Sequence, residues 1–293
     1  MYYGIIEKSW LEQVRALWKE AFGDSESYMD FYFENIFPQN IVFGAIEHDR
    51  LVSMVHLNPY TVCFEGNDID IHYIVGVATA SDYRRRGIMK RLLKLGTDYL
   101  QAAGEKFTYL MPANEIYYKS LGFEKYENSY LMPVGMFQGE ENQDFLIRTV
   151  DCIDEEMLHE FNINLKSRYD LFVPRDMRYA NVLDMQCRAE SGRAYVLCKD
   201  KHIQAMFGMM KGEKTYECVE YLSLNYTMEE IVRIYTLLGY DIPESVEIFG
   251  AEPLWRGKKL NVSKGKGIMY KILYNGFSND IFYDKMLMIN EIV

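Results

Sequence analysis

The segment "IVGVATASDYRRRGIMKRLL", residues 74–93, decides the expected fold, because a strand, a tight turn and a helix follow one another within it. The apolar, β-branched run ends near Thr79, and a helical pattern of apolar residues begins near Arg86. Gly87 permits a tight turn and lets a ligand approach the backbone closely. The first amides of a helix lack internal partners and its dipole adds partial positive charge there, so this junction is typical of a pyrophosphate-binding site.

Three roles are open for the basic run Arg84–Arg86: nucleic-acid binding, a solvated charged turn, or support of a bound phosphate. The net charge of −11 and the pI of about 5.1 argue against a general nucleic-acid binder, which needs a basic face. The segment contains neither the Walker pattern G-x-x-x-x-G-K-[ST] nor the Rossmann pattern G-x-G-x-x-G. The preceding strand and the tyrosine-containing segment 113–123 favour the phosphate over the charged turn.

Composition places the chain among globular proteins with two domains. It has 293 residues, of which 49% are hydrophobic and 15% aromatic, so sizeable cores are expected. No run is long and apolar enough for a membrane span, and the first ten residues are too polar for a signal peptide. The five cysteines show no C-x-x-C spacing, which predicts buried free thiols in a reducing cytoplasm and neither zinc nor disulfides.

The first 138 residues have the pattern of an α/β unit. Helical periodicity covers 10–22, 25–37, 86–103 and 114–123, and strand patterns cover 2–9, 41–66, 68–79, 106–112 and 123–134. In the strand 68–79 we expect strict alternation of side chains between the two faces of a sheet. One face would carry Tyr73, Val75, Val77 and Thr79, and the other His72, Ile74, Gly76 and Ala78.

A second unit follows a polar stretch at 138–144, "QGEENQD", which we interpret as a linker. From 145 to 261 the order is two helices, three strands, a helix and a strand, which resembles the order of the first unit. This second unit has no equivalent of the Arg-Arg-Arg-Gly run, so we interpret it as a degenerate copy. Residues 262–293 form closing strands that we expect to return toward the active site.

The quoted segment resembles the acetyl-CoA-binding motif of the GNAT N-acetyltransferase superfamily, R/Q-x-x-G-x-G/A after a central strand. Arg84, Gly87 and Met89 occupy the motif positions, and Met89 departs from the usual small residue. The segment "ANEIYYKSLGF", residues 113–123, is similar to the short tyrosine-bearing helix of the family. The Arg-Arg-Arg-Gly run and the two-unit organisation resemble the enhanced intracellular survival subgroup, in which a degenerate GNAT domain follows the first. The resemblance implies a GNAT fold, a mixed central sheet flanked by helices.

The resemblance also implies a function, namely acetyl transfer from acetyl-CoA to a primary amine by direct attack, with no metal. Tyr118 matches the tyrosine that acts as general acid toward the thiolate, and we expect the neighbouring Tyr117 to lie in the core. The resemblance implies that backbone groups bind the cosubstrate. The pantetheine arm would contact the backbone of Val77, Ala78 and Thr79, and the pyrophosphate would contact the amides of Arg85, Arg86, Gly87, Ile88, Met89 and Lys90. Arg84 would add supporting charge, and the cosubstrate would also touch Ala113 and Asn114 at the start of the next helix.

The general base is less defined by the sequence. In the subgroup the C-terminal carboxylate enters the active site, and in this chain that carboxylate belongs to Val293. A frayed terminus is the other interpretation. His72 on the central strand is an alternative base, although a lone strand histidine is more often structural. Asp24 and Glu26 could contact a cationic substrate or simply begin a helix.

Three functions therefore stay open. The first is an active cytoplasmic N-acetyltransferase for a small or peptidyl amine, and the second a catalytically inactive acyl-CoA-binding or regulatory module. The third is an assembly protein whose second unit only packs against partners. Tyr118 and the intact motif favour the enzyme. The resemblance further implies assembly into a homo-oligomer, and neither nucleic acid nor membrane is expected as a partner.

Overall fold

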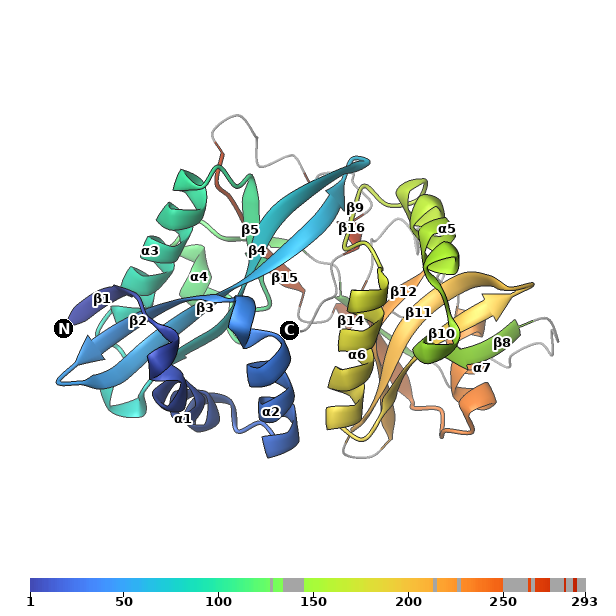
Figure 1. Cartoon of the computed structure of the whole chain (residues 1–293), viewed down its shortest axis with the longest axis horizontal. Coiled ribbons are helices and arrows are strands. Elements are labelled where there is room, and N and C mark those ends of the chain that lie inside the picture. Colours follow the sequence, from blue (N-terminus) through green and yellow to red (C-terminus); the bar gives the residue numbers. More distant parts are fainter. Residues whose placement is uncertain are drawn as a thin grey trace.

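The chain alternates helices and strands along its length and builds two sheet-containing regions side by side (Figure 1). In this computed structural model the described residues are 1–126, 129–133, 145–212, 215–225, 228–249, 263–264, 267–274, 282 and 287–288. The expected α/β class with a mixed central sheet flanked by helices is confirmed.

The first region follows the element order that periodicity predicts. Its elements are β1 (Tyr2–Ile5), α1 (Leu11–Phe22), α2 (Glu26–Asn35), β2 (Ile41–Glu47), β3 (Arg50–Phe64), β4 (Asn67–Thr79), α3 (Ile88–Ala102), β5 (Phe107–Leu110), α4 (Ile116–Lys119) and β6 (Glu124–Tyr126). Gly23 ends α1 in the left-handed conformation, and the Ser25 hydroxyl caps α2 by accepting the Tyr28 amide at 3.1 Å.

The strands of this region form one sheet in the order β1-β2-β3-β4-β5-β15-β6. The first four strands are antiparallel, and β5 joins β4 in parallel after the α3 crossover. The strand β15 (Ile268–Ile272) comes from the closing segment of the chain and lies between β5 and β6, antiparallel to both. Residues far apart in the sequence therefore complete the sheet next to β5.

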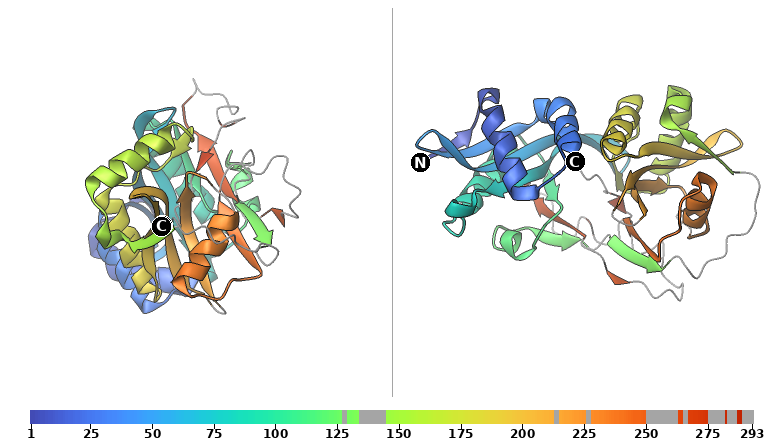
Figure 2. Two further views of the ribbon diagram at one scale, coloured as in Figure 1. Left: turned by 90° about the vertical axis from the view of Figure 1, so that its right-hand side faces the viewer. Right: turned by 90° about the horizontal axis from the view of Figure 1, so that it is seen from below.

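Helices cover both faces of the sheet. Viewed from below, α1 and α2 lie on one face and α3 on the other (Figure 2, right). On the α3 face, Leu92 and Leu100 belong to a buried cluster with Val55 and Leu57 of β3. On the opposite face, Trp18, Tyr32 and Met54 are buried together. Burial of these apolar side chains from water is what holds the helices to the sheet.

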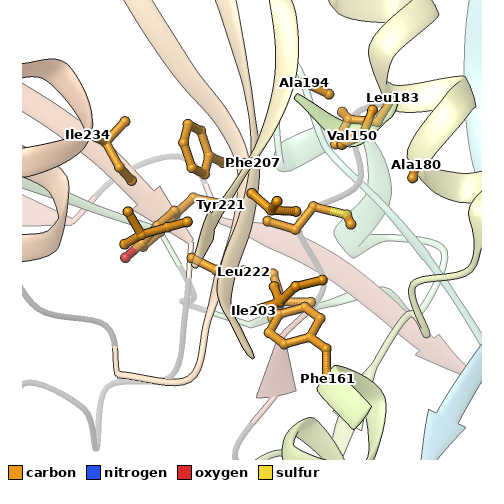
Figure 3. Close-up of a cluster of buried hydrophobic side chains, with 14 of the residues drawn as sticks. Val150, Phe161, Ala180, Leu183, Ala194, Ile203, Phe207, Tyr221, Leu222 and Ile234 are labelled. Carbon is orange, nitrogen blue, oxygen red and sulfur yellow. The ribbon is translucent and has the colours of Figure 1, made fainter. Parts of the chain in front are cut away.

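The second region repeats this order of elements. It comprises β8 (Phe145–Thr149), α5 (Glu155–Lys166), α6 (Met177–Ala189), β10 (Arg193–Lys199), β11 (His202–Lys211), β12 (Tyr216–Ser223), α7 (Met228–Leu238) and β13 (Ser245–Phe249). Its sheet has the order β12-β11-β10-β8. Phe161, Phe207, Leu222 and Ile234 meet in its own buried core (Figure 3).

Strand pairings also join the first region to later parts of the chain. The strand β7 (Ser129–Pro133) follows β6 but pairs with β13 and with β14 (Ser263–Lys264). The short strand β9 (Leu171–Phe172) pairs with the far end of β3 and, in parallel, with β16 (Leu287–Met288). The predicted linker 138–144 lies outside the described residues. Domain boundaries at 138, 145 and 261 stay a proposal.

Cysteine burial departs from the prediction in two of five cases. Cys63, Cys187 and Cys198 are buried, whereas Cys152 is exposed and Cys218 half-buried. Cys152 ends the short 3-10 helix Val150–Cys152 that follows β8, and its thiol donates to Asp151 Oδ1 at 3.6 Å. No helix within the described part of the chain is both long and apolar enough to cross a membrane.

Candidate functional site

The centre of the first sheet is open where β4 and β5 diverge. Their parallel pairing is confined to Tyr73 opposite Tyr109 and Ile74 opposite Leu110. Strand β5 ends at Leu110, but β4 continues to Thr79. The last five residues of β4 therefore have no β5 partner, and their backbone groups on that side are available to a ligand that lies along the strand.

A β-bulge shapes the open part of β4. Val75 and Ala78 lie opposite His56 and Met54, which are two residues apart on β3 and so share a face. Val75 and Ala78 therefore share a face too, and the predicted strict alternation along 68–79 is wrong. The cause is Gly76, whose φ of 60° inserts one extra residue into the strand.

The backbone groups predicted to bind pantetheine are partly engaged within the protein. The Ser53 hydroxyl donates to the Ala78 carbonyl at 2.7 Å, and Arg84 Nε donates to the Thr79 carbonyl at 3.1 Å. Val77 belongs to the bulge and has no register partner on β3. Among the three predicted residues, Val77 offers the backbone that is freest for a ligand.

The start of α3 has the features of an anion site. Gly87 caps the helix in the left-handed conformation with φ of 75°, and a β-carbon there would meet nothing within 4 Å. The first helical backbone hydrogen bond runs from the Arg91 amide to the Gly87 carbonyl, so the amides of residues 88–90 have no partner inside the helix. The turn 84–87 is exposed, and the half-buried Met89 side chain packs against the buried cluster of the α3 face.

The three arginines do different things. Arg84 ties the turn to β4 through Thr79, and Arg86 donates to the Asp82 carbonyl at 2.7 Å and lies 4.7 Å over the Tyr83 ring. Arg85, with φ of 63°, makes no hydrogen bond or ion pair to another described residue. Arg84 and Arg86 thus support the turn, and the exposed guanidinium of Arg85 is available to bind an anion.

Tyr118 lies on α4 and is 6% exposed, with its ring 5.9 Å from that of Phe123. Burial, with a smaller contribution from Tyr117, raises the pKa of Tyr118 to about 12. Tyr117 is 55% exposed, so the prediction that it lies in the core is wrong. The helix has only four residues, and Tyr117 and Ile116 are exposed on its outer side.

Ala113 and Asn114 lie where β5 leads into α4. They line an open pocket of about 340 Å³ together with Glu115, Ile116 and Lys119. The Asn114 carboxamide oxygen accepts the Ile116 amide at 3.0 Å and so begins the α4 turn. Glu115 pairs with Lys119 and Lys125, which holds this turn next to β6.

Comparison with known proteins identifies the first region. Residues 3–126 match the family described as "Acetyltransferase (GNAT) domain". This region, which matches the GNAT family model, is called the GNAT domain below. The open β4–β5 edge, the α3 start and Tyr118 all lie within it. No curated protein matches the sequence.

Solved structures resemble nearly the whole chain. A conserved protein of unknown function from Enterococcus faecalis V583, a probable N-acyltransferase, is 16% identical with a TM-score of 0.69 over 97% of this chain and 74% of that one. Eis1 from Mycobacterium abscessus is 11% identical, with a TM-score of 0.60 over 93% and 73%. N-myristoyltransferase from Saccharomyces cerevisiae is 11% identical, with a TM-score of 0.53 over 92% and 77%. At these identities the likeness shows the fold.

The other predicted residues lie elsewhere in the GNAT domain or outside the described residues. His72 Nδ1 lies 2.6 Å from Glu105, beyond the C-terminal end of α3. The seven residue-to-residue steps of β4 from His72 to Thr79 span about 23 Å, so His72 is far from the α3 start. Asp24 accepts Trp18 Nε1 at 2.7 Å, and Glu26 pairs with Lys19 at 3.0 Å. Val293 lies outside the described residues.

Sequence patterns missed two features of the site. One is the buried pair of His56 and Tyr32 behind the β4 bulge, joined at 2.8 Å. The other is a cavity of about 670 Å³ between the GNAT domain and α6. The Gly76 position inside an apolar strand could have signalled the bulge. No local pattern could have signalled the cavity, because its walls come from distant parts of the chain.

Proposed function

We propose that the chain is an N-acetyltransferase that moves the acetyl group of acetyl-CoA to a primary amine. The observation that carries the proposal is the open edge of β4 directly before the unpartnered amides of α3. The match to the GNAT family supports an acyltransferase. The open edge followed by the helix start fits a long cosubstrate that has a pantetheine arm and a pyrophosphate.

The pyrophosphate would bind the amides of residues 85–90, where the helix dipole adds favourable charge. The exposed guanidinium of Arg85 adds charge at the mouth, and Arg84 and Arg86 hold the turn. The pantetheine arm would lie along β4, where its amide groups can pair with the strand at Val77 as an added strand would. Ala113 and Asn114 would border its reactive end.

The chemistry follows from the groups at this edge. The neutral amine nitrogen attacks the thioester carbonyl carbon, and the carbon–sulfur bond breaks as the amide forms. The departing thiolate takes the phenolic proton of Tyr118. A general base receives the proton lost by the amine and passes it on to the phenolate, which restores the neutral phenol. With its pKa raised to about 12, Tyr118 carries its proton throughout the neutral range, as a general acid must.

The base that receives the proton of the amine is a separate part of the proposal. The carboxylate of Val293 remains our prediction for it, from the resemblance to the enhanced intracellular survival subgroup. Extension of the chain by a few residues beyond Val293 should then abolish turnover and leave acetyl-CoA binding intact. Full activity of the extended protein would exclude this carboxylate.

Adjacent tyrosines provide the matched test of the acid. Tyr118→Phe removes only the phenolic oxygen, so acetyl-CoA binding should stay unchanged while kcat falls roughly 10²-fold or more. Tyr117→Phe alters an exposed ring on the same short helix and should behave as wild type. Both are measured by calorimetric titration of acetyl-CoA and by release of free thiol in the presence of an amine.

Equal turnover in the two variants would remove Tyr118 from the mechanism. Acetyl-CoA binding without thiol release from any of a panel of polyamines, aminoglycosides and lysine peptides would instead favour the inactive acyl-CoA-binding module.

A further inference from the structure

The turn that leads from β4 into α3 is held by elements that come earlier in the chain. The Ala80 amide donates to the Val52 carbonyl of β3 at 2.9 Å, and the Glu20 carboxylate of α1 accepts the Ser81 amide at 2.8 Å. These bonds fix the beginning of the short 3-10 helix Ser81–Tyr83 that opens the turn. The conformation before the α3 start therefore depends on β3 and α1 as well as on the turn itself.

Arg50, the first residue of β3, makes a two-pronged contact with this turn. Its guanidinium donates to the Asp82 carboxylate from Nη1 to Oδ2 at 2.7 Å and from Nη2 to Oδ1 at 3.0 Å. A bidentate pair of this kind fixes orientation as well as distance. The same hydrogen bonds, as the main cause, hold the pKa of Asp82 below its usual range. Arg50 thus ties the β2–β3 hairpin to the 3-10 helix.

Tyr83 extends this contact toward the α3 start. The Arg50 guanidinium lies over the Tyr83 ring, 5.4 Å from its centroid, and that of Arg86 lies 4.7 Å from the same centroid. Arg86 also donates to the Asp82 carbonyl at 2.7 Å and directly precedes Gly87. A continuous series of contacts therefore runs from Arg50 to the helix start that is proposed to bind the pyrophosphate.

The Arg50–Asp82 pair also affects the charge of the site. Asp82 lies three residues before Arg85, whose guanidinium is available to an anion. An unpaired carboxylate at this position would repel a pyrophosphate. The two side chains of the pair are 50% and 53% exposed, so the pair adds little to the stability of the fold. We expect its effect on the bound ligand instead.

We infer that Arg50 is a positioning residue for the pyrophosphate of acetyl-CoA. It acts through Asp82 and Tyr83, holds the turn 80–87 in the conformation that binds, and neutralises the carboxylate beside it. Arg50 itself does not need to touch the cosubstrate. The inference rests on the proposed function, which places acetyl-CoA at this turn.

Calorimetric titration of the full chain with acetyl-CoA compares Arg50→Gln with a matched control. Arg50→Gln removes both hydrogen bonds and leaves Asp82 unpaired, so the Kd should rise about fivefold. Arg15 makes the same kinds of contact between α1 and α2, with Asp30 at 2.7 Å and with the Phe33 ring at 5.1 Å. Arg15→Gln should therefore leave the Kd for acetyl-CoA unchanged.

Two further variants separate positioning from charge. Arg50→Lys keeps the charge, but an ammonium group cannot form the planar two-pronged pair, so it should recover only part of the affinity. The double variant Arg50→Gln/Asp82→Asn leaves no unpaired carboxylate and should also recover only part. In turnover, Arg50→Gln should raise the KM for acetyl-CoA and leave kcat unchanged, because it lies away from the reacting atoms.

The outcomes distinguish this inference from the proposed function. A wild type that binds acetyl-CoA no more tightly than Arg50→Gln would overturn the role of Arg50 and leave the proposed function standing. An equal rise in Kd for Arg15→Gln would overturn it too. Full affinity in Arg50→Lys or in the double variant would mean that only charge matters, and would overturn the positioning role. No binding by the wild type would overturn both proposals. Should Arg50→Gln lack a cooperative thermal melt, Arg50→Lys decides.

Discussion

At the scale of single residues, a buried and neutral histidine lies at the centre of the GNAT domain. His56 is fully buried, and its Nδ1 lies 2.8 Å from the Tyr32 hydroxyl. That hydroxyl accepts from the Asn40 amide at 2.9 Å, so its own hydrogen points to His56. Burial, with a smaller effect of Lys8, lowers the pKa of His56 to about 3. The ring is therefore uncharged at neutral pH and packs behind the β4 bulge.

The lowered pKa predicts that His56 makes the protein acid-sensitive. A histidine with a depressed folded pKa contributes stability that is complete above its unfolded pKa of about 6.5 and is lost as the pH falls toward 3. Between pH 7 and pH 5 the cost is about 2 kcal/mol in the free energy of unfolding. His56→Gln should lose that part of the pH dependence, while exposed His202→Gln should keep it.

Urea denaturation of the three proteins at pH 7 and pH 5 measures this difference. The same drop in unfolding free energy in wild type and His56→Gln would mean that His56 is not the group that titrates.

At the scale of elements, the bulge of β4 depends on Gly76. A β-carbon there would lie 2.7 Å from the Trp18 ring and 3.0 Å from His56, and φ is positive. Gly76→Ala should therefore lower the unfolding free energy by roughly 2–5 kcal/mol, through strain and steric overlap together. It should also weaken acetyl-CoA binding, because the neighbouring Val77 shifts.

Gly66→Ala separates strain from overlap. Gly66 has φ of 80° at the β3–β4 turn, but a β-carbon there meets nothing within 4 Å. This variant should lose only about 1–2 kcal/mol and bind acetyl-CoA normally. Comparable losses in both variants, measured by thermal and chemical unfolding, would show that the contacts of Gly76 do not hold the bulge.

Element positions were largely predictable from the sequence, and distortions within elements were not. The apolar periodicity of residues 88–100 and the glycine before it predicted α3 and its exposed start, because both signals are local. The bulge was missed because alternation is the default of any strand, and Gly76 was the one local signal against it. The close approach of Trp18 and His56, which leaves no room for a β-carbon at Gly76, comes from distant parts of the chain. Tyr117 was placed wrongly because a four-residue helix carries too little periodicity to define its buried side.

At the scale of the whole molecule, the two regions are interlocked and not merely consecutive. Strand β15 lies between β5 and β6 of the GNAT domain, where Met269, Tyr270 and Leu273 are buried. Such pairings join residues more than 140 positions apart, and a single sequence has no local signal for them. The cavity between α2 and α6 was unpredictable for the same reason.

This interlocking predicts that residues 1–138 do not fold alone. Without β15, strands β5 and β6 lose the strand between them and the apolar surface that its buried side chains cover. The fragment should lack a cooperative thermal transition and should not bind acetyl-CoA. The full chain should show a cooperative transition and should bind acetyl-CoA. A soluble fragment with a cooperative transition and full acetyl-CoA affinity would show that β15 is dispensable.

The most direct measurement of the central claim follows both products of the reaction. The full chain is incubated with acetyl-CoA and spermidine, free thiol is titrated, and acetylated amine is quantified by mass spectrometry over time. Acetyl transfer predicts that acetylated amine and free coenzyme A appear in equal amounts, at a rate that depends on Tyr118. Tight binding of acetyl-CoA with no acetylated amine, from spermidine or any other amine of the panel, would contradict the enzyme and leave a binding module.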